Sequence, residues 1–157
     1  MGGTETWVWD QVSNRGVANP VIFHLEAGVH TLEIKQREDG TKIDRILITN
    51  DMGYVPEGLG EEEIPPIQPV KLWLEAEEGE LTAPLEIAND YDASSGEYIL
   101  IPNGQGNVWD SGQEAGYAEY SFEVPEAGDF VVWGRVISNS DYDDSFFVSI
   151  DNGEYAL

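Results

Sequence analysis

Several residue types are missing or scarce in this chain of 157 residues, and each shortage excludes a class of function. The chain has no cysteine, which excludes disulfides, thiolate metal sites and cysteine nucleophiles. Its two histidines, His24 and His30, are too few for a histidine-rich transition-metal site. Only seven Lys and Arg stand against 31 Asp and Glu, and the resulting net charge of −24 opposes binding to nucleic acid and to anionic membranes.

Long apolar runs are missing too. No run reaches the roughly 18 residues of a membrane-spanning helix, and no secretory leader is recognisable. The opening Met1–Gly3 is typical of an expression start. Secretion of the parent protein is therefore inferred and is not read from a leader sequence. The acidic charge fits cations, neutral sugars and basic proteins as partners, and solubility in a salty medium is the alternative explanation of the same charge.

What the sequence has is a period of two. Apolar and polar residues alternate along most of the chain, as at Leu32 and Ile34, and Gly, Pro, Asn or Asp bounds each run. No segment has a convincing helical period. The pattern predicts an all-β sandwich or barrel, with strands over 6–12, 21–25, 29–36, 42–49, 72–77, 98–101, 117–124, 130–137 and 145–150.

A Pro-rich acidic stretch, residues 56–70, divides the chain into the blocks 4–55 and 71–157. We interpret it as a linker, since Pro removes ladder donors and its glutamates repel one another. Neither block looks complete. Asn152-Gly153 follows a predicted strand and signals a hairpin, yet no return strand follows it. We expect strand 6–12 to supply that strand, so that one domain over 1–157 forms with the second block placed before the first.

Three carboxylates form a candidate metal site. Glu75 and Glu77 lie two apart in a predicted strand and would share one face of it. In the rotated order, the strand of Asp44 can pair beside theirs. Together with backbone carbonyls of the turn around Gly96, these groups suit calcium, which takes oxygen ligands. The alternative is that both glutamates are solvated and that Asp44 pairs with a neighbouring Arg45 or Lys42.

Aromatic rings are the candidate sugar-binding residues, because flat rings present apolar faces to the C–H faces of sugars. Trp109 lies in a Gly- and Asn-rich stretch, and Tyr91 lies in a predicted loop where its ring could form an opposing wall. Trp7 and Trp9 share one strand face. Core packing is the alternative role for each ring.

Enzyme activity is not expected. The pair Glu75 and Glu77 is better explained by a metal, and no other carboxylate pair suggests glycoside hydrolysis. The sequence has no nucleophile–base pair for acyl transfer, no phosphate-binding loop and no zinc motif.

Read with the second block first, the chain resembles the carbohydrate-binding modules of families 6 and 35, which are jelly-roll β-sandwiches with the galactose-binding-domain-like fold. The resemblance covers nearly everything except the linker and Met1–Gly3. Its motifs are L-E-A-E-E-G at 74–79, D-A-S-S-G-E-Y-I at 92–99, A-E-Y-S-F-E-V-P-E-A-G at 118–128, D-D-S-F-F-V-S-I-D at 143–151, W-V-W at 7–9, L-E-A-G-V-H-T-L at 25–32 and I-D-R-I at 43–46.

This resemblance implies a circularly permuted, non-catalytic, secreted module that binds extracellular polysaccharide. It also implies a structural calcium at the positions of Asp44, Glu75 and Glu77, and a ligand-stacking ring near strand 6–12. The chain has Lys42 where the family often has a sugar-binding Asn, which could favour an acidic sugar. The alternative function is a structural, self-assembling repeat or an engineered permutant, in which blocks swapped between molecules form homo-oligomers.

Overall fold

The computed structural model describes residues 6–61, 69–140 and 143–157, and within them the fold is all-β, as predicted. None of the helices there is long and apolar enough to span a membrane. The elements are β1 (Val8–Gln11), β2 (Phe23–Leu25), β3 (Gly28–Gln36), β4 (Lys42–Thr49), β5 (Lys71–Glu75), the 3₁₀ turn η1 (Ala76–Glu78), β6 (Glu80–Thr82), β7 (Glu86–Asn89), β8 (Glu97–Leu100), β9 (Tyr117–Val124), β10 (Gly128–Ile137) and β11 (Phe146–Ile150).

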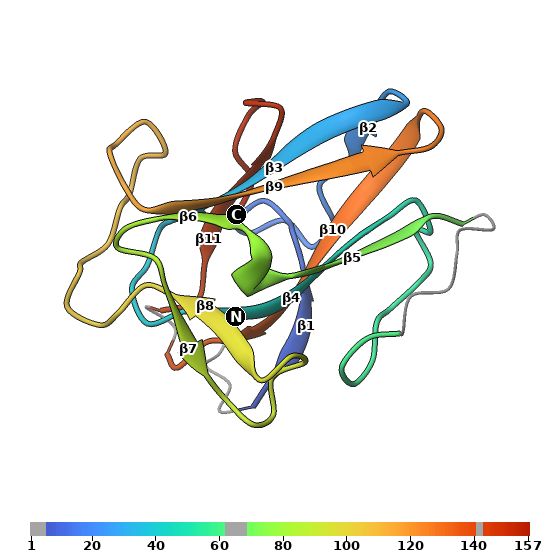
Figure 1. Cartoon of the computed structure of the whole chain (residues 1–157). Coiled ribbons are helices and arrows are strands. Elements are labelled where there is room, and N and C mark those ends of the chain that lie inside the picture. Colours follow the sequence, from blue (N-terminus) through green and yellow to red (C-terminus); the bar gives the residue numbers. More distant parts are fainter. Residues whose placement is uncertain (1–5, 62–68, 141–142) are drawn as a thin grey trace.

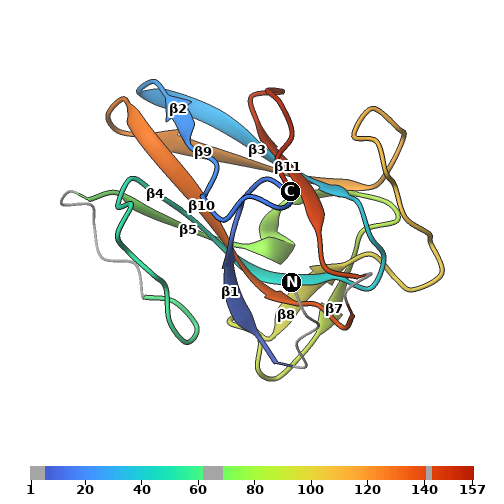
Figure 2. The same cartoon turned by 180° about the vertical axis from the view of Figure 1, so that it is seen from behind.

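Two antiparallel sheets make a β-sandwich-like architecture (Figures 1 and 2). One sheet has the order β1-β10-β4-β8-β7, with β2 also paired to β10 and β5 also paired to β4. The other has the order β11-β3-β9-β6. Strands of the two blocks are interleaved in both sheets, since β10 lies between β1 and β4, and β3 lies between β11 and β9. Each block therefore depends on the other for its neighbours.

The core lies between the two sheets and follows from the alternation in the sequence. Leu32 and Ile34 point inward from β3, and Ile46 and Ile48 point inward from β4. Phe130 of β10 is fully buried among them. Burying one such side chain contributes about 1.5–3 kcal/mol, so these positions carry much of the stability.

All nine predicted strands are present, and the register of β4 and β5 confirms the expected pairing of their segments, with Arg45 opposite Glu75. The short strands β6 and β7 were not predicted. The prediction that strand 72–77 continues through Glu77 is wrong, because β5 ends at Glu75 and η1 follows. The turn buries Ala76, whose carbonyl accepts a 2.7 Å hydrogen bond from the hydroxyl of Tyr120.

The expected origin of the return strand after β11 is also wrong. β1 pairs with β10, and not with β11. The end of the chain itself turns back, since Asp151 and Asn152 both have positive φ and Ala156 then bridges to Val148. The last residue, Leu157, exchanges two backbone hydrogen bonds with Ser13, which follows β1.

The two ends of the segment between the blocks lie side by side. The carboxamide of Asn50 accepts the N–H of Val70 at 2.7 Å, and the hydroxyl of Thr49 donates to the Val70 carbonyl at 2.6 Å. The described part of the predicted linker packs on the large sheet, where Pro56 is buried and Gly60 lies against Trp73. Residues 49–50 and Val70, which flank most of this segment, are therefore held next to each other.

A histidine–aspartate pair fastens the turn after β11 to β3. The Nδ1 of His30 lies 2.6 Å from Asp151, and its Nε2 lies 2.8 Å from the carbonyl of Glu26. These two contacts raise the pKa of His30 above its usual value. Burial pushes the pKa of Asp151 upward, but hydrogen bonds from His30 and from the Thr31 backbone outweigh burial and lower it.

We expect the charged form of this pair to stabilise the fold most between the ordinary pKa values of aspartate and histidine, about 4 and 6.5. The contribution of His30 is lost as the pH rises through its raised pKa, and that of Asp151 as the pH falls through its lowered pKa. His30→Gln should therefore lower the melting temperature by a few degrees at about pH 5.5, consistent with roughly 1 kcal/mol or less. Thermal unfolding of both proteins from pH 5 to 9 measures this, and a deficit that does not shrink by pH 9 would contradict it.

Candidate functional site

Trp7 precedes β1 on the outer face of the large sheet and belongs to a row of stacked side chains. Its ring contacts the edge of Tyr98, with the ring centroids 5.5 Å apart. On one side the ammonium of Lys42 lies 5.3 Å from the Tyr98 ring, and on the other the guanidinium of Arg135 lies 5.4 Å from the Trp7 ring. Such contacts hold the indole in one orientation.

Tyr91 lies in the loop between β7 and β8. Asp90 shapes this loop, because its carboxylate accepts the N–H of Asp92 at 2.9 Å and its own N–H donates to the carbonyl of Gly96 at 3.1 Å. The tight turn leaves the Tyr91 side chain in solvent, with 99% of its surface exposed. The exposed face of such a ring is a surface on which a ligand can stack.

Trp7 and Tyr91 meet at one open depression, whose volume is about 570 Å³. This volume lies in the range of small-molecule sites. The two rings come from different blocks of the chain. The depression is lined by Thr6, Trp7, Gly58, Leu59, Asp90, Tyr91, Asp92, Ala93, Arg135 and Ile137.

Arg135 forms the buried support of the depression and is only 7% exposed. Its guanidinium pairs with Asp44, which is completely buried, and donates to the carbonyls of Asp92 at 3.0 Å and Gly58 at 3.0 Å. One cation thereby holds the Tyr91 loop, the segment after β4 and strand β4 around the same hollow. Its charge is matched by the Asp44 carboxylate.

The other predicted sugar-binding residues lie elsewhere. Trp9 packs edge-on to Trp73, with centroids 5.6 Å apart, and its indole N–H donates to the Gly58 carbonyl at 3.1 Å. Trp109 is 64% exposed on the loop between β8 and β9, where it stacks on Arg37, and it does not line the depression. Lys42 does not line it either. The structure therefore brings together two of the five predicted residues.

The three predicted metal-binding carboxylates gather around one loop. The hydroxyl of Ser94 contacts both Asp44, at 2.9 Å, and Glu75, while the hydroxyl of Ser95 contacts Glu77. Asp44 is buried as expected, but its partner is Arg135 and neither Arg45 nor Lys42. The alternative of a solvated Glu75 does not hold either, because Glu75 forms an ion pair with Arg45 at 3.0 Å.

Glu77 is the least satisfied of the three. Burial raises its pKa, and the negative charges of Glu75 and Asp44 raise it further, against a hydrogen bond from Ser95. Its Oε2 is buried without a hydrogen-bond partner. The Gly96 carbonyl is engaged with the Asp90 N–H. With the side chains in these positions, the described residues contain no group of three or more histidines, aspartates or glutamates that is arranged to hold a metal ion.

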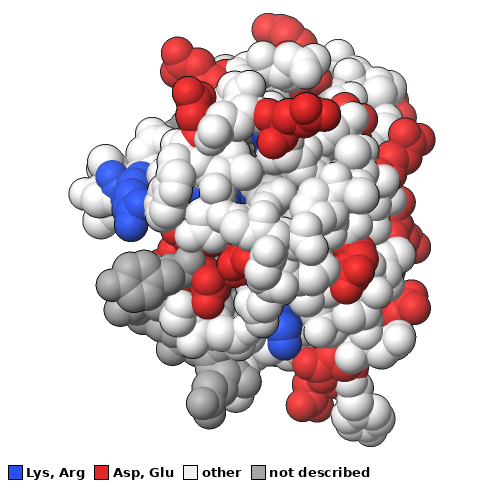
Figure 3. All heavy atoms as spheres, turned by 90° about the vertical axis from the view of Figure 1, so that its left-hand side faces the viewer, with Lys and Arg blue, Asp and Glu red and all other residues white. Residues whose placement is uncertain are grey.

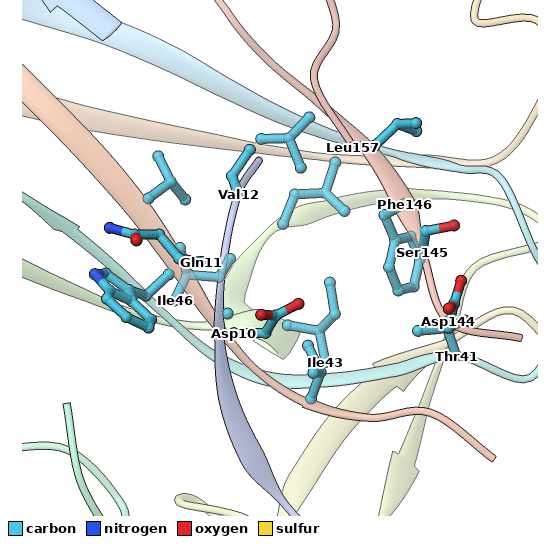
Figure 4. Close-up of a pocket in the computed structure, with 16 residues that line it drawn as sticks. Asp10, Gln11, Val12, Thr41, Ile43, Ile46, Asp144, Ser145, Phe146 and Leu157 are labelled. Atoms are coloured by element: carbon cyan, nitrogen blue, oxygen red, sulfur yellow. The ribbon is translucent and has the colours of Figure 1, made fainter. Parts of the chain in front are cut away.

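A second hollow lies between the sheets, between β1 and β11 (Figure 4). It is mainly apolar, and the Asp10 side chain points from β1 toward the side where Thr41 and Ser145 lie. Burial raises the pKa of Asp10. The hollow has a volume of about 80 Å³, which holds a few water molecules but no sugar ring.

Sequence reasoning missed three charged residues of the depression. Asp90 and Asp92 flank Tyr91 directly in the sequence, and this acid-aromatic-acid pattern was the available signal. Arg135 occupies a position in β10 whose side chain points to the outer face beside Arg45 of β4. A basic residue inside an otherwise apolar strand is a signal for a buried ion pair.

Replacing Arg135 should be the most disruptive single change at this site. In Arg135→Met the fully buried Asp44 loses its cation, and an unpaired buried charge typically costs about 3–5 kcal/mol of unfolding free energy. Arg45→Met is the matched control, because its partner Glu75 is partly exposed and the expected loss is about 1 kcal/mol. Urea unfolding of both variants measures the difference, and equal losses would show that the Arg135 pair has no special weight.

Comparisons of the chain with protein-family models, with curated proteins and with solved structures find no match. The candidate site is therefore defined by the chemistry and geometry of this chain itself: an exposed tyrosine and a held tryptophan, contributed by different blocks, on the walls of one depression.

Proposed function

We propose that this chain is a non-catalytic carbohydrate-binding module that binds extracellular polysaccharide at the depression between Trp7 and Tyr91. It would be a jelly-roll sandwich of the family 6 and 35 type with its blocks in rotated order. The observation that carries the proposal is that the exposed Tyr91 ring and the held Trp7 indole line one depression of about 570 Å³. Aromatic walls with a few polar groups are the usual composition of a sugar site.

The polar groups of the depression suit binding and do not suit hydrolysis. Asp90 and Asp92 can accept hydrogen bonds from sugar hydroxyls at the edge of the Tyr91 ring. Both carboxylates come from the same short loop, whereas glycoside hydrolysis uses two carboxyl groups that flank the scissile bond from opposite sides. This arrangement supports a binding role.

Calcium is part of the proposal. The donors around Ser94 and Ser95 are all oxygen atoms, as calcium requires, and the Oε2 of Glu77 is buried without a partner. Asp44, Glu75 and Glu77 would hold the ion beside the pairs of Asp44 with Arg135 and of Glu75 with Arg45, and the ion would offset the repulsion that adds to burial in raising the pKa of Glu77. Because Ser94 belongs to the loop that carries Tyr91, the ion would stabilise that loop.

Segment swapping between molecules has less support than closure within one chain. β4 and β5 are antiparallel neighbours, and Val70 is hydrogen-bonded to both Thr49 and Asn50. The connecting segment thus begins and ends at the same place, and the domain can close without a partner.

Removing the Tyr91 ring should weaken sugar binding without unfolding the protein. We expect Tyr91→Ala to lose about tenfold in affinity for the best ligand found on a glycan array, since one exposed stacking ring contributes about 1–1.5 kcal/mol. The melting temperature should stay the same, because the side chain is in solvent. Trp109→Ala removes another exposed ring and should bind normally; isothermal titration calorimetry that finds the two variants equal would reject the depression as the site.

Calcium should raise the melting temperature of the chelator-treated protein. At one hundred times the dissociation constant the gain is about 2.7 kcal/mol, or roughly 5–10 °C. Glu77→Gln should abolish this gain, and without calcium it should be slightly more stable than the parent at pH 7, because the charged form of a carboxyl with a raised pKa is unfavourable there. Glu123→Gln, an exposed change on β9, should keep the full gain. An unchanged melting temperature of the parent would reject the calcium site.

A further inference from the structure

Resting on the proposed sugar-binding function, we propose that the depression selects amino sugars with a free, protonated amine, such as the glucosamine units of chitosan, over neutral and acidic sugars. The choice follows from the charges at the Tyr91 wall. Asp90 and Asp92 stand on either side of Tyr91 and line the same depression. A sugar stacked on that ring would place its ring substituents next to these carboxylates.

Arg135, the one cation in the lining among the described residues, does not balance these carboxylates. Arg135 is buried and paired with Asp44, and its remaining contacts are carbonyl oxygens of Asp92 and Gly58. Moving the guanidinium away from these contacts toward a ligand would leave the buried Asp44 unpaired, so Arg135 stays in its place in the fold. Its positive charge is therefore already matched, and the accessible charge of the depression is negative.

Of the seven Lys and Arg residues, the six other than Arg135 do not line the depression as described. Lys42, at the position that suggested an acidic sugar, lies against Tyr98 and does not line the depression. Lys35, Arg37, Arg45 and Lys71 each lie over an aromatic ring. Acidic side chains are spread over the face shown in Figure 3, with basic groups at few places. A net charge of −24 attracts a cationic polysaccharide and repels uronic acids.

Two features distinguish binding at the depression from the general attraction of a cationic sugar to an acidic surface. The Tyr91 ring gives a sugar a stacking surface at the carboxylates, and the bonds of Asp90 to Asp92 and Gly96 hold that loop in shape. Asp92 is exposed, whereas Asp90 is half-buried, so one amine can contact a carboxylate that water screens only in part. Selectivity should therefore depend on these two aspartates and not on the total charge.

The test uses three trisaccharides that share a β-1,4-linked glucose backbone and differ only at carbon 2: chitotriose with amines, tri-N-acetylchitotriose with acetamides, and cellotriose with hydroxyls. Affinities are measured by calorimetry at pH 6 in low salt and again in about 500 mM NaCl. We expect chitotriose to bind at least about fivefold more tightly than the other two in low salt. The preference should shrink in high salt, where charges on the surface are screened.

Asp90→Asn and Asp92→Asn should each reduce the preference by about twofold, and the double variant should nearly abolish it. The carboxamide that Asp90→Asn introduces keeps an oxygen that can accept the N–H of Asp92, so the loop should survive, and the melting temperature checks this. Glu123→Gln removes the same charge from an exposed position on β9 and should keep the preference.

The outcomes separate this inference from the proposed function. Equal binding of the three trisaccharides would overturn selection by charge but leave a sugar site. Equal loss in Glu123→Gln and in the aspartate variants would also overturn it, since the attraction would then belong to the whole surface. Binding of none of the three, with none of the wider glycan set bound either, would overturn both proposals.

Discussion

The ion pair between Arg135 and Asp44 is the contact on which the rest of the structure depends. Both side chains are buried in the large sheet, and they join β10 of the second block to β4 of the first. The guanidinium also holds the Tyr91 loop and the segment at Gly58 through their carbonyls, and it lies over Trp7. Desolvation of such a pair is costly, and these extra hydrogen bonds offset it.

Most of the other basic side chains, like Arg135, contact an aromatic ring. The chain has only seven basic residues, and six of them lie over an aromatic ring; the pairs are Lys35–Tyr155, Arg37–Trp109, Lys42–Tyr98, Arg45–Trp73, Lys71–Tyr54 and Arg135–Trp7. Such contacts usually occur about once in 70–80 residues, so this density is high. These six side chains are buried or partly buried, and the 31 Asp and Glu residues dominate the charge that the surface presents.

Period-two alternation predicted the fold class and all nine of the strands it named because each half-buried strand must place apolar residues on one face. It could not predict the break after Glu75, where burial of Ala76 and the hydroxyl of Tyr120 override the alternation. Nor could it predict that the chain end after Asp151 completes the hairpin, since the returning segment pairs through the bridge of Ala156 to Val148 and is too short to show a period. Short strands such as β6 have too few residues to show a period.

The site was predictable only in part, for a related reason. Exposure of Tyr91 follows from its loop and was anticipated, whereas the packing of Trp9 depends on Gly58, which is 49 residues distant in the sequence. Likewise, the pairing of the strands of Asp44 and Glu75 was predicted, but the turn that carries Glu77, the serine partners and Arg135 were not. Local patterns indicate which residue types could act, and long-range packing decides which of them meet.

If the depression binds the proposed ligand, its location links that binding to the assembly of the fold. Trp7 belongs to the first block, Tyr91 and Arg135 to the second, and Gly58 to the segment between them. A ligand that contacts both walls can bind only when the blocks are joined, so it stabilises their association by RT ln(1 + [L]/Kd). The same coupling works in reverse. Any change that loosens the Arg135 anchor lowers the population of the joined state and weakens binding, even where the changed residue never touches the ligand.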